Sequence, residues 1–405
     1  MHDPRFESCV SATLRRPSVR LIIVIVPFFV LATFAWFGAS PKLIVILSGP
    51  TEELSRPFLI VDRSSSSCYQ GCFQLSAVGP STTGCPFSCV FDSALSKVID
   101  NKRVAAADMV FDWISSSSKW RRPGQLLVGY EAESPENHRA VKDPAIMREY
   151  NYSFTYRASD TFPWDQKRFG AFWLAWSALR DKHLLPDPIP FEVKRKAASV
   201  STVISGGTQA NRRRKMIHIL ASSQFNISFA HYGTFLRSAN AESANMAKWN
   251  QSVIASLPQI GGKYWTKIRA IAQHLFHFAA ENSDCDWYHT EKVKHALIAG
   301  TVPIYLGSKT IEEYVPPGSI IQVRDFDSAK DLAKELSAIS SSRERYEQYL
   351  SWRTKPLGEH IQLKMANAWG TESSVRLHCK FCEWAHRREP SVLKPFSDCH
   401  PPVKW

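Results

Sequence analysis

Several motifs that mark common enzyme classes are missing from this sequence. It contains neither G-x-G-x-x-G nor G-x-x-x-x-G-K-[ST], so a standard dinucleotide site or a P-loop is not expected. It also lacks G-x-S-x-G, the nucleophile turn of many serine hydrolases. No internal repeat is present, and nine cysteines in 405 residues are too sparse for a small disulfide scaffold. The chemistry of this chain must therefore rest on other residues.

The composition is that of an ordinary globular protein with an excess of positive charge. Hydrophobic residues make up 44% and charged residues 21%, which excludes wholesale disorder and collagen-like repetition. The length predicts two or three domains and is sufficient to bury a large core. Fifty basic residues against 37 acidic ones give a formal net charge of +13. That balance indicates an anionic partner, such as nucleic acid, a phosphorylated ligand or a membrane surface.

An uncharged apolar segment lies close to the N-terminus. Residues 21–39 contain no charged side chain and are just long enough to span a bilayer. Three arginines precede this segment: Arg15, Arg16 and Arg20. We therefore expect a transmembrane signal anchor, with residues 1–20 in the cytoplasm and the rest of the chain in a lumen. The alternatives are a cleaved signal peptide and a buried core helix.

A lumenal position bears on the sequons and on the cysteines. Three N-x-[ST] sequons are candidate glycosylation sites, at Asn151, Asn226 and Asn250. Eight of the nine cysteines follow the anchor, and an oxidising compartment predicts up to four disulfides among them, with the pairing left open. The same placement removes nucleic acid from reach, so nucleic acid is not an expected partner.

The lumenal part begins with an expected stem at residues 40–67, followed by a first domain at residues 68–190. Short apolar runs predict buried strands in this domain, at 108–111, 125–129 and 152–156. A cluster of prolines between residues 186 and 190 then marks a boundary between domains.

The pattern restarts in a second domain at residues 191–360, followed by a cysteine-containing C-terminal tail at 361–405. Strands are expected at 197–204, 227–230, 301–306 and 319–323, a helix followed by a strand across 263–280, and helices at 291–299 and 328–353. Strands alternating with helices predict parallel sheets built from βαβ units. The fold class is therefore α/β, with two Rossmann-like domains facing a cleft.

Two D-x-D triplets and one basic run are further candidate sites. The triplets are Asp284-Cys-Asp286 and Asp325-Phe-Asp327, and paired carboxylates of this kind can hold a divalent ion. The triplet is short and common by chance, so a metal site is the minority interpretation. The basic run at residues 212–215 is either a helix start that contacts phosphate or a solvated face.

A Cys-x-x-Cys motif lies near the C-terminus. Cys379 and Cys382, with His378 and His386 beside them, have the spacing of half a zinc site. In an oxidising lumen, a disulfide-bonded turn is the better interpretation.

The densest cluster of polar residues lies between Ala280 and Pro303. It contains three blocks at fixed spacing: Ala280-Glu-Asn-Ser, Asp286-Trp-Tyr-His-Thr-Glu-Lys and Ala296-Leu-Ile-Ala-Gly-Thr-Val-Pro. This segment resembles the α1,3/4-fucosyltransferases, whose signature is F-E-N-S, D-Y-x-T-E-K and A-L-x-A-G-x-V-P. The family's phenylalanine is replaced by Ala280 here. Trp287-Tyr288-His289 replaces an aromatic residue followed by Ile or Val in the family.

Further elements agree with this family in order, so that the resemblance covers residues 85–355. They are Cys89-Val-Phe-Asp92 with Ala107-Asp108, Glu133-Ser134-Pro135 with Asn137, Tyr152 to Asp160, and Asp325-Phe326 with Tyr349 to Arg353. The stretch 200–215 departs from the family, and its Asn211 and Arg213 match S-N-C-x-x-x-N-x-R only loosely. A short N-terminal anchor is typical of the family.

The resemblance implies that L-fucose is transferred from GDP-fucose to a GlcNAc residue, with inversion and in an α1,3 linkage. It also implies a GT-B-like fold, in which the first domain binds the acceptor and the second binds GDP-fucose. Such a reaction needs a carboxylate that takes the proton of the acceptor hydroxyl. Glu133 matches the family's base, and Glu131 is its local rival.

The donor requires cations that neutralise the departing diphosphate. Lys292 matches this role, and Arg213 is the expected second cation, with Arg212 and Arg214 as alternatives. Glu291 is expected to hold the ribose hydroxyls. The other donor-binding residues that the resemblance implies are Asn211, Glu281, Asn282 and Tyr288, and on the acceptor side it implies Arg157 and Asp160.

The resemblance implies no required cofactor and no metal site, although stimulation by Mn²⁺ or Mg²⁺ stays open. The expected partners are GDP-fucose, a glycan acceptor on glycoproteins, and the membrane through the N-terminal helix. The expected location is the Golgi membrane, as a single-pass type II protein with a lumenal catalytic part. The acceptor is either the innermost GlcNAc of N-glycans or an outer N-acetyllactosamine arm. The alternatives are a catalytically inactive lumenal glycan-binding protein of the same fold and transfer to a different acceptor sugar.

Overall fold

The computed structural model describes the chain in segments. They are residues 57–63, 85–93, 101–115, 121–157, 162–163, 185, 187–194, 199–205, 210–235, 263–355, 374–388 and 393–405. The chain divides into residues 1–55 and 56–405, and every described segment belongs to the second unit. The expected membrane anchor at 21–39 lies outside these segments. Within them, no helix combines the length and the apolar character needed to cross a membrane.

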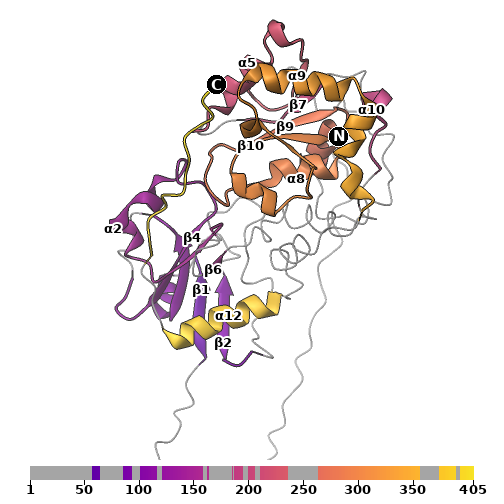
Figure 1. The fold of residues 1–405 in the computed structure, drawn as a ribbon. Helices are drawn as coiled ribbons and strands as arrows, with labels where there is room; N and C mark the ends of the chain where they lie inside the picture. The colour runs from indigo at the N-terminus through magenta and orange to yellow at the C-terminus, as the bar shows by residue number, and fades with distance from the viewer. Residues whose placement is uncertain are drawn as a thin grey trace, which may run out of the picture. The chain divides into compact units, whose positions relative to one another are not determined.

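Six parallel strands form the first sheet, in the order β2-β1-β3-β4-β5-β6 (Figure 1). Their bounds are β1 Phe58–Asp62, β2 Cys89–Ser93, β3 Met109–Trp113, β4 Leu126–Glu131, β5 Tyr152–Thr155 and β6 Phe162–Pro163. The strands predicted at 108–111, 125–129 and 152–156 are confirmed as β3, β4 and β5. Every residue of β4 is buried, as expected for an inner strand of a parallel sheet that is covered on both faces.

Five parallel strands form the second sheet, in the order β11-β10-β9-β7-β8. Their bounds are β7 Val200–Thr202, β8 Phe229–His231, β9 Phe276–Ala280, β10 Val302–Leu306 and β11 Ile321–Gln322. The alternation of strands and helices predicted for this part is confirmed. The two all-parallel sheets establish the α/β class.

The helices fall into two groups along the chain. Those that accompany the first sheet are α1 Asn101–Ala106, η3 Arg139–Lys142, α2 Pro144–Met147 and α12 Ser374–Arg387. Between them in sequence are α4 Phe191–Lys194, α5 Arg213–Leu220, η6 Ser223–Phe225, α7 Lys263–Ala272, α8 Glu291–Ile298, η10 Lys309–Glu313, η11 Val323–Asp325, α9 Ala329–Ser340, α10 Arg343–Gln348 and η12 Ser351–Arg353.

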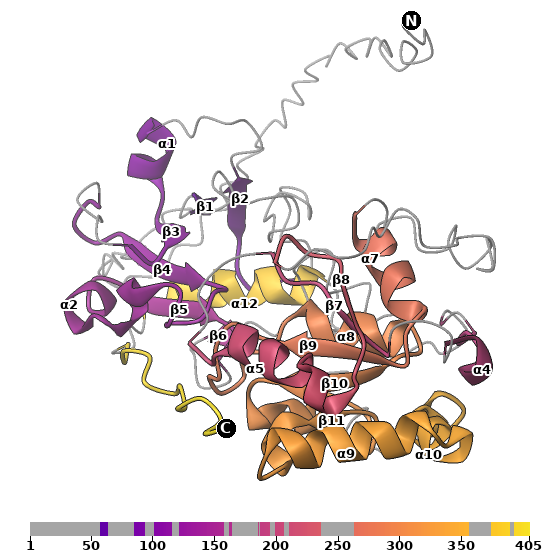
Figure 2. The ribbon, with the colours of Figure 1, turned by 90° about the horizontal axis from the view of Figure 1, so that it is seen from above.

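Helices cover both faces of the second sheet (Figure 2). Phe276 and Phe278 of β9 belong to one buried cluster, together with Leu332 of α9. Ala279, the residue after Phe278, belongs to another cluster with Ile271 of α7 and with residues of α8. Alternate side chains of a strand point to opposite faces, so β9 is buried from both sides.

Two sequence predictions for the second sheet are only partly correct. The single helix expected at 328–353 is divided into α9, α10 and η12. The break occurs because the side chain of Ser342 accepts a hydrogen bond from the backbone N–H of Arg345 and caps a new helix. The strand expected at 319–323 extends only over Ile321–Gln322 and continues as the 3-10 helix η11.

The C-terminal helix α12 packs on the first sheet, although the two lie at opposite ends of the sequence (Figure 1). Phe381 is fully buried, and its ring meets Phe111 and Phe154 edge-on, at centroid distances of 4.8 and 5.5 Å. Two disulfides, Cys85–Cys379 and Cys89–Cys382, tie α12 to β2 and to the residues before it. Both apolar packing and covalent bonds therefore hold the chain end in place.

The disulfide-bonded turn predicted for Cys379 and Cys382 is wrong. Residues three apart in a helix project from the same face, so both sulfur atoms face the segment around β2 and bond to it instead of to each other. Of the other cysteines, Cys68 and Cys72 lie outside the described residues.

Removing one of these disulfides should destabilise the fold. Replacing Cys89 and Cys382 together by serine should lower the free energy of unfolding by about 2–5 kcal/mol, because the denatured chain loses a long cross-link. Urea unfolding of the oxidised proteins measures the difference. The exposed Arg387→Gln on the same helix is the control and should change the free energy by less than about 0.5 kcal/mol. An unchanged unfolding midpoint for the double variant would contradict the prediction.

Candidate functional site

Polar side chains from both sheets meet just beyond the ends of two strands. Glu131 ends β4, and Glu133 follows in the next loop. Glu281 and Asn282 come directly after β9. The carboxyl ends of parallel strands are the usual place for a ligand site in α/β folds. Hydrogen bonds between the loop after β4 and the segment after β9 define the candidate site.

Glu133 is held by hydrogen bonds from both segments. Its Oε1 accepts them from the Tyr288 hydroxyl at 2.6 Å, from Asn282 Nδ2 at 3.0 Å and from the Ser134 backbone N–H at 2.8 Å. Burial by itself favours the neutral acid, but these donors outweigh it and lower the pKa of Glu133 below its usual value. Burial and the charge of Glu133 raise the pKa of Tyr288 well above its usual value, so its hydroxyl stays protonated and donates.

A second set of contacts joins the same two segments. The Ser134 hydroxyl lies 2.7 Å from that of Ser283 and donates to Asn282 Oδ1 at 3.2 Å. Ser283 also donates to Asn282 Oδ1, at 2.9 Å. The side-chain amide of Asn282 is therefore fixed with its nitrogen directed at Glu133.

Glu131, the alternative base, is enclosed. Its side chain is 1% exposed, and its Oε1 accepts the backbone N–H groups of Ala132 and Glu133 at 2.8 and 2.7 Å. Its Oε2 is hydrogen-bonded to Nδ1 of His138. Burial lowers the pKa of His138, so the neutral ring donates its Nδ1–H to the carboxylate, which only accepts. The geometry therefore favours Glu133 as the group that meets a substrate.

Glu281 organises the start of α8. It is fully buried, and its Oε1 accepts the backbone N–H of Thr290 at 2.6 Å. Its Oε2 accepts hydrogen bonds from the Thr290 hydroxyl at 2.7 Å and from Lys292 Nζ at 3.0 Å. Burial opposes the charged form of Lys292, but Glu281 and Glu291 outweigh this and raise the pKa of Lys292. A fixed cation thus lies in the first turn of a helix, where the N-terminus already favours anions.

Glu291 is the first residue of α8 and lies between two lysines. Its Oε1 accepts a hydrogen bond from Lys267 Nζ at 3.1 Å, and its Oε2 lies 4.0 Å from Lys292 Nζ. Burial disfavours the carboxylate, but these cations and His295 outweigh it and lower the pKa of Glu291 well below its usual value. Glu291 is therefore ionised.

The structure separates the three candidate arginines. Arg213, the first residue of α5, is 5% exposed, and its guanidinium donates to the Ala280 carbonyl at 3.3 Å. Arg212 is exposed. The guanidinium of Arg214 lies 4.5 Å from the centre of the Phe235 ring. Arg213 thus contacts the last residue of β9, directly before Glu281 and Asn282.

Asn211 connects Arg213 to the same segment. Its Nδ2 donates to the Glu281 carbonyl at 2.9 Å, and its Oδ1 accepts the backbone N–H of Arg213 at 3.3 Å. The structure thus brings together all of the predicted donor-side residues, which come from the start of α5 and the residues just before it, from α8, and from the segment after β9.

On the predicted acceptor side, Arg157 lies against the C-terminal segment. Its Nε is 3.5 Å from Asp398 Oδ2, and its guanidinium lies 4.4 Å from the centre of the Phe396 ring. Burial raises the pKa of Asp398. Asp160 lies outside the described residues.

The C-terminal segment, residues 393–405, also braces the donor side. A disulfide joins Cys285 to Cys399, and the two residues form an antiparallel bridge. Beside it, the backbone N–H of Asp286 donates to the Asp398 carbonyl at 2.9 Å. The segment that carries Tyr288 is therefore fixed covalently just upstream of that residue.

Protein groups engage the first of the two D-x-D triplets. Both oxygens of Asp284 accept hydrogen bonds from Arg324, at 3.0 and 2.8 Å. Asp286 Oδ1 lies 2.9 Å from His400 Nε2. Burial raises the pKa of Asp325, in the second triplet. In the described part of the chain, neither triplet forms a cluster of three potential metal ligands.

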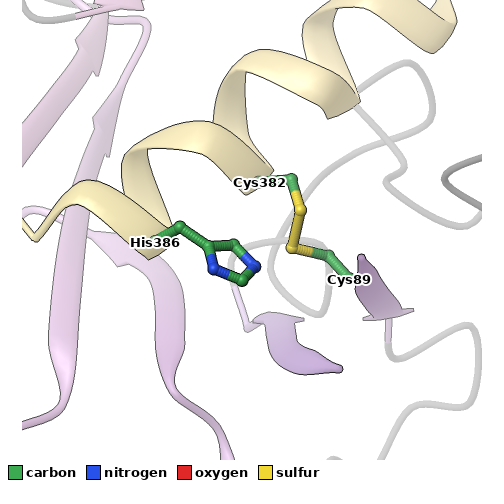
Figure 3. Close-up of side chains that lie close together, drawn as sticks. All are labelled: Cys89, Cys382 and His386. Atoms are coloured by element: carbon green, nitrogen blue, oxygen red, sulfur yellow. A yellow bond between two sulfur atoms is a disulfide. The ribbon is translucent and has the colours of Figure 1, made fainter. Parts of the chain in front are cut away.

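One such cluster does occur there, formed by Cys89, Cys382 and His386 (Figure 3). The two sulfur atoms are bonded to each other, so they offer no thiolate to a metal. The ring of His386 instead packs against Phe58 and Phe87, at centroid distances of 4.2 and 4.7 Å. The cluster therefore has a structural role, since it joins α12 to the first sheet through a disulfide and ring packing.

The sequons differ in accessibility. Asn151 accepts two hydrogen bonds on Oδ1, and Ser153 of the same sequon is 2% exposed within β5. Asn226 and Ser228 are both exposed, and Asn226 adopts a left-handed conformation after η6. Asn250 lies outside the described residues.

Three residues of the site were not singled out from the sequence: His138, Lys267 and Asp398. Each is a common charged or titratable residue that meets its partner through the tertiary fold. Lys267, for example, reaches Glu291 from a neighbouring helix, 24 residues away in sequence. No motif or spacing could have indicated these pairs.

The family of this chain follows from a sequence comparison. A family model described as glycosyltransferase family 10 (fucosyltransferase), C-terminal part, matches residues 193–398. The match spans the donor-side residues described above. The chain thus belongs to a family of glycosyltransferases. More narrowly, it belongs to the fucosyltransferases of family 10, and the resemblance found in the sequence is confirmed.

Known relatives are similar only at a moderate level. A 4-galactosyl-N-acetylglucosaminide 3-alpha-L-fucosyltransferase 9 from Bos taurus is 28% identical over 251 residues, 61% of this chain and 58% of that protein. A GDP-fucose protein O-fucosyltransferase 3 from Homo sapiens is 27% identical over 249 residues, 60% of this chain and 48% of that protein. A solved alpha1,3-fucosyltransferase aligns over 80% of this chain and 93% of its own, with 14% identity and a TM-score of 0.48. The chain spans about half the length of the curated relatives it matches.

The ionised Glu133 should make the fold sensitive to acid. Because its pKa is lower in the folded protein than its usual 4.5, the carboxylate contributes stability above that value, and this contribution is lost as the pH falls through the folded pKa. Glu133→Gln should therefore lower the free energy of unfolding at neutral pH, and the difference from wild type should shrink in acid. Urea unfolding of both proteins across this range measures the difference.

The exposed Glu344→Gln is the matched control and should show no such narrowing. If the difference in the free energy of unfolding between Glu133→Gln and wild type stayed constant down to low pH, the prediction would be contradicted.

Proposed function

We propose that this protein transfers L-fucose from GDP-fucose to a GlcNAc residue of a glycoprotein glycan, with inversion and in an α1,3 linkage. The observation that carries the proposal is the contact of Glu133 with Tyr288 and Asn282. It places an ionised carboxylate from the first sheet against the donor-side segment of the second. Family membership supports the fucosyl chemistry.

In this mechanism, Glu133 acts as the general base. An oxygen of the acceptor hydroxyl attacks the anomeric carbon of fucose while Glu133 takes the proton, and the bond to GDP breaks with its electron pair leaving on the diphosphate. The lowered pKa of Glu133 keeps it deprotonated at neutral pH, and its hydrogen bonds fix its direction before the substrate arrives.

The departing diphosphate is stabilised by cations. The positive charges of Lys292 and Arg213 offset the negative charge of the diphosphate, and the dipole at the N-terminus of α8 adds to this effect. In the structure Lys292 is bonded to Glu281 and Thr290, so binding of the diphosphate exchanges one anionic partner for another. Glu291 accepts hydrogen bonds from the ribose hydroxyls, and side chains of the protein perform these steps without a required metal or cofactor.

The cellular setting belongs to the same proposal. It comprises a GT-B-like pair of domains at residues 68–190 and 191–360, a signal anchor at 21–39 and a stem at 40–67. The protein is then a single-pass type II protein of the Golgi membrane. Among the described sequons, that of Asn226 is the more accessible one for glycosylation. The sequence pattern near the N-terminus supports this arrangement.

A second acceptor class has a specific observation in its favour. The similarity to the human protein O-fucosyltransferase 3 is as strong as that to the bovine 3-alpha-L-fucosyltransferase. A serine or threonine hydroxyl of a protein is therefore the alternative acceptor. A catalytically inactive glycan-binding protein is the alternative from another class, and the presence of Glu133, Glu291 and Lys292 argues against it.

An acceptor panel tests the proposal directly. The full chain is incubated with GDP-fucose and, separately, with an N-glycan that exposes its innermost GlcNAc, with N-acetyllactosamine, and with folded proteins that carry serine and threonine. We expect transfer to a GlcNAc-containing glycan. Transfer only to protein hydroxyls would favour the alternative acceptor, and the absence of both transfer and GDP-fucose binding would refute the proposal.

Glu133→Gln should abolish turnover and leave GDP binding nearly intact. The amide keeps the size of the side chain but cannot take a proton, so the rate should fall by a factor of about 100 to 10,000. Steady-state rates and calorimetric titration with GDP measure the two effects. The control is Glu136→Gln in the same loop. Equal losses of binding and turnover would point to a structural role for Glu133.

Arg213→Gln should weaken GDP binding, whereas Arg212→Gln should not. Arg213 is buried at the donor-side segment, and a lost charged hydrogen bond to a phosphate costs about 1.5–3 kcal/mol, roughly a tenfold to hundredfold change in affinity. Arg212 precedes it and is exposed, so it is the matched control. Calorimetric titration with GDP checks both variants, and a larger loss at Arg212 would contradict the assignment.

A further inference from the structure

The loop between β4 and η3 is closed by a hydrogen-bonded pair that the sequence motif does not include. The resemblance to the fucosyltransferase family covers Glu133 to Asn137, whereas Glu131 and His138 flank it on either side. These two residues meet through Glu131 Oε2 and His138 Nδ1. The pair therefore spans the loop that carries the proposed base.

Glu131 holds the base through the backbone as well. Its Oε1 accepts the N–H of Glu133 at 2.7 Å and that of Ala132 at 2.8 Å. At the far end of the loop, the backbone N–H groups of Asn137 and His138 donate to the Ser134 carbonyl, at 2.9 and 2.8 Å. One carboxylate thus fixes the start of the loop and, through His138, its end.

The burial of Glu131 makes this pairing important. Its side chain is 1% exposed, and a buried carboxylate that loses a donor is strongly destabilised. Without the imidazole, Oε2 would lack its hydrogen bond, and the loop would have to move to bring that oxygen toward water. Any such movement shifts Glu133, which is attached to the same carboxylate through its N–H.

The position of Glu133 tolerates little movement. Its hydrogen bonds to Tyr288 and Asn282 are 2.6 and 3.0 Å long, and the partners come from a segment 155 and 149 residues further along the chain. A displacement of about 1 Å would break such bonds, and misplacement on this scale lowers catalytic rates by up to about 100-fold.

We propose that Glu131 and His138 are positioning residues, which together hold the loop of residues 131–138 so that Glu133 meets the donor-side segment. This inference rests on the proposed function, because it assigns the pair a role toward the base. His138 is the residue to vary, since its side chain is 35% exposed and its loss leaves no buried cavity.

The experiment uses the full chain with His138→Phe, which keeps a ring but removes the donor, and His138→Asn, whose amide nitrogen can replace Nδ1. The control is His218→Phe, at an exposed histidine on α5. We expect His138→Phe to lower kcat by about 10- to 100-fold with GDP affinity unchanged, and His138→Asn to restore most of the rate. Rates are measured with the acceptor that gives transfer in the panel, or as hydrolysis of GDP-fucose.

Amide hydrogen exchange provides a readout that does not depend on activity. Exchange in the peptide of residues 131–138 should increase in His138→Phe and return toward wild type in His138→Asn. Unchanged exchange in His138→Phe would overturn the inference, whether or not the protein transfers fucose. If the variants show these changes in exchange but the wild-type protein binds no GDP, the proposed function alone would be refuted.

Two further results would also overturn the inference. One is a loss of GDP affinity in parallel with the loss of rate, which would assign the pair to general stability. The other is an equal loss of rate in His138→Asn and His138→Phe, which would show that the imidazole itself is needed.

Discussion

The hydrogen bonds that Glu133 accepts from Tyr288 and Asn282 are the interaction on which the rest of the site depends. A carboxylate that is largely removed from water stays ionised only if donors surround it, and each such charged hydrogen bond contributes about 1.5–3 kcal/mol. Here the donors come from the other sheet's loop. The protonation state and the direction of the Glu133 side chain therefore depend on the whole arrangement of strands, and on the Cys285–Cys399 disulfide that braces the segment before Tyr288.

The donor side follows the same rule with the charges reversed. Lys267, Lys292 and Arg213 face Glu281 and Glu291, so three cations and two anions leave a local charge of +1. The excess of +13 over the whole chain is therefore spread mostly over other residues. In the proposed function, a diphosphate is recognised by a few fixed cations, and the total charge of the chain contributes little.

The sequence predicted most strands and helix α8 well, because buried runs such as β3 to β5 and the apolar spacing of α8 are local patterns. The prediction of one long helix at 328–353 failed because Ser342 caps a new helix, although the apolar spacing continues on both sides of this residue. The sequence could not choose among Arg212, Arg213 and Arg214, because their orientation depends on a left-handed residue at Arg212 that spacing does not reveal. The partners of Cys379 and Cys382, and the pairing of Glu131 with His138, depend on tertiary contacts in the same way.

The return of α12 to the first sheet has a consequence for how the chain folds during its synthesis. Phe381, Cys382 and Ala385 complete a buried cluster whose other members lie between residues 58 and 154. When the ribosome has made the first six strands, the side chains of α12 that complete this cluster have not yet been synthesised. They follow more than two hundred residues later. The N-terminal half therefore emerges with apolar surface exposed, and Cys85 and Cys89 lack their native disulfide partners until the last helix is made.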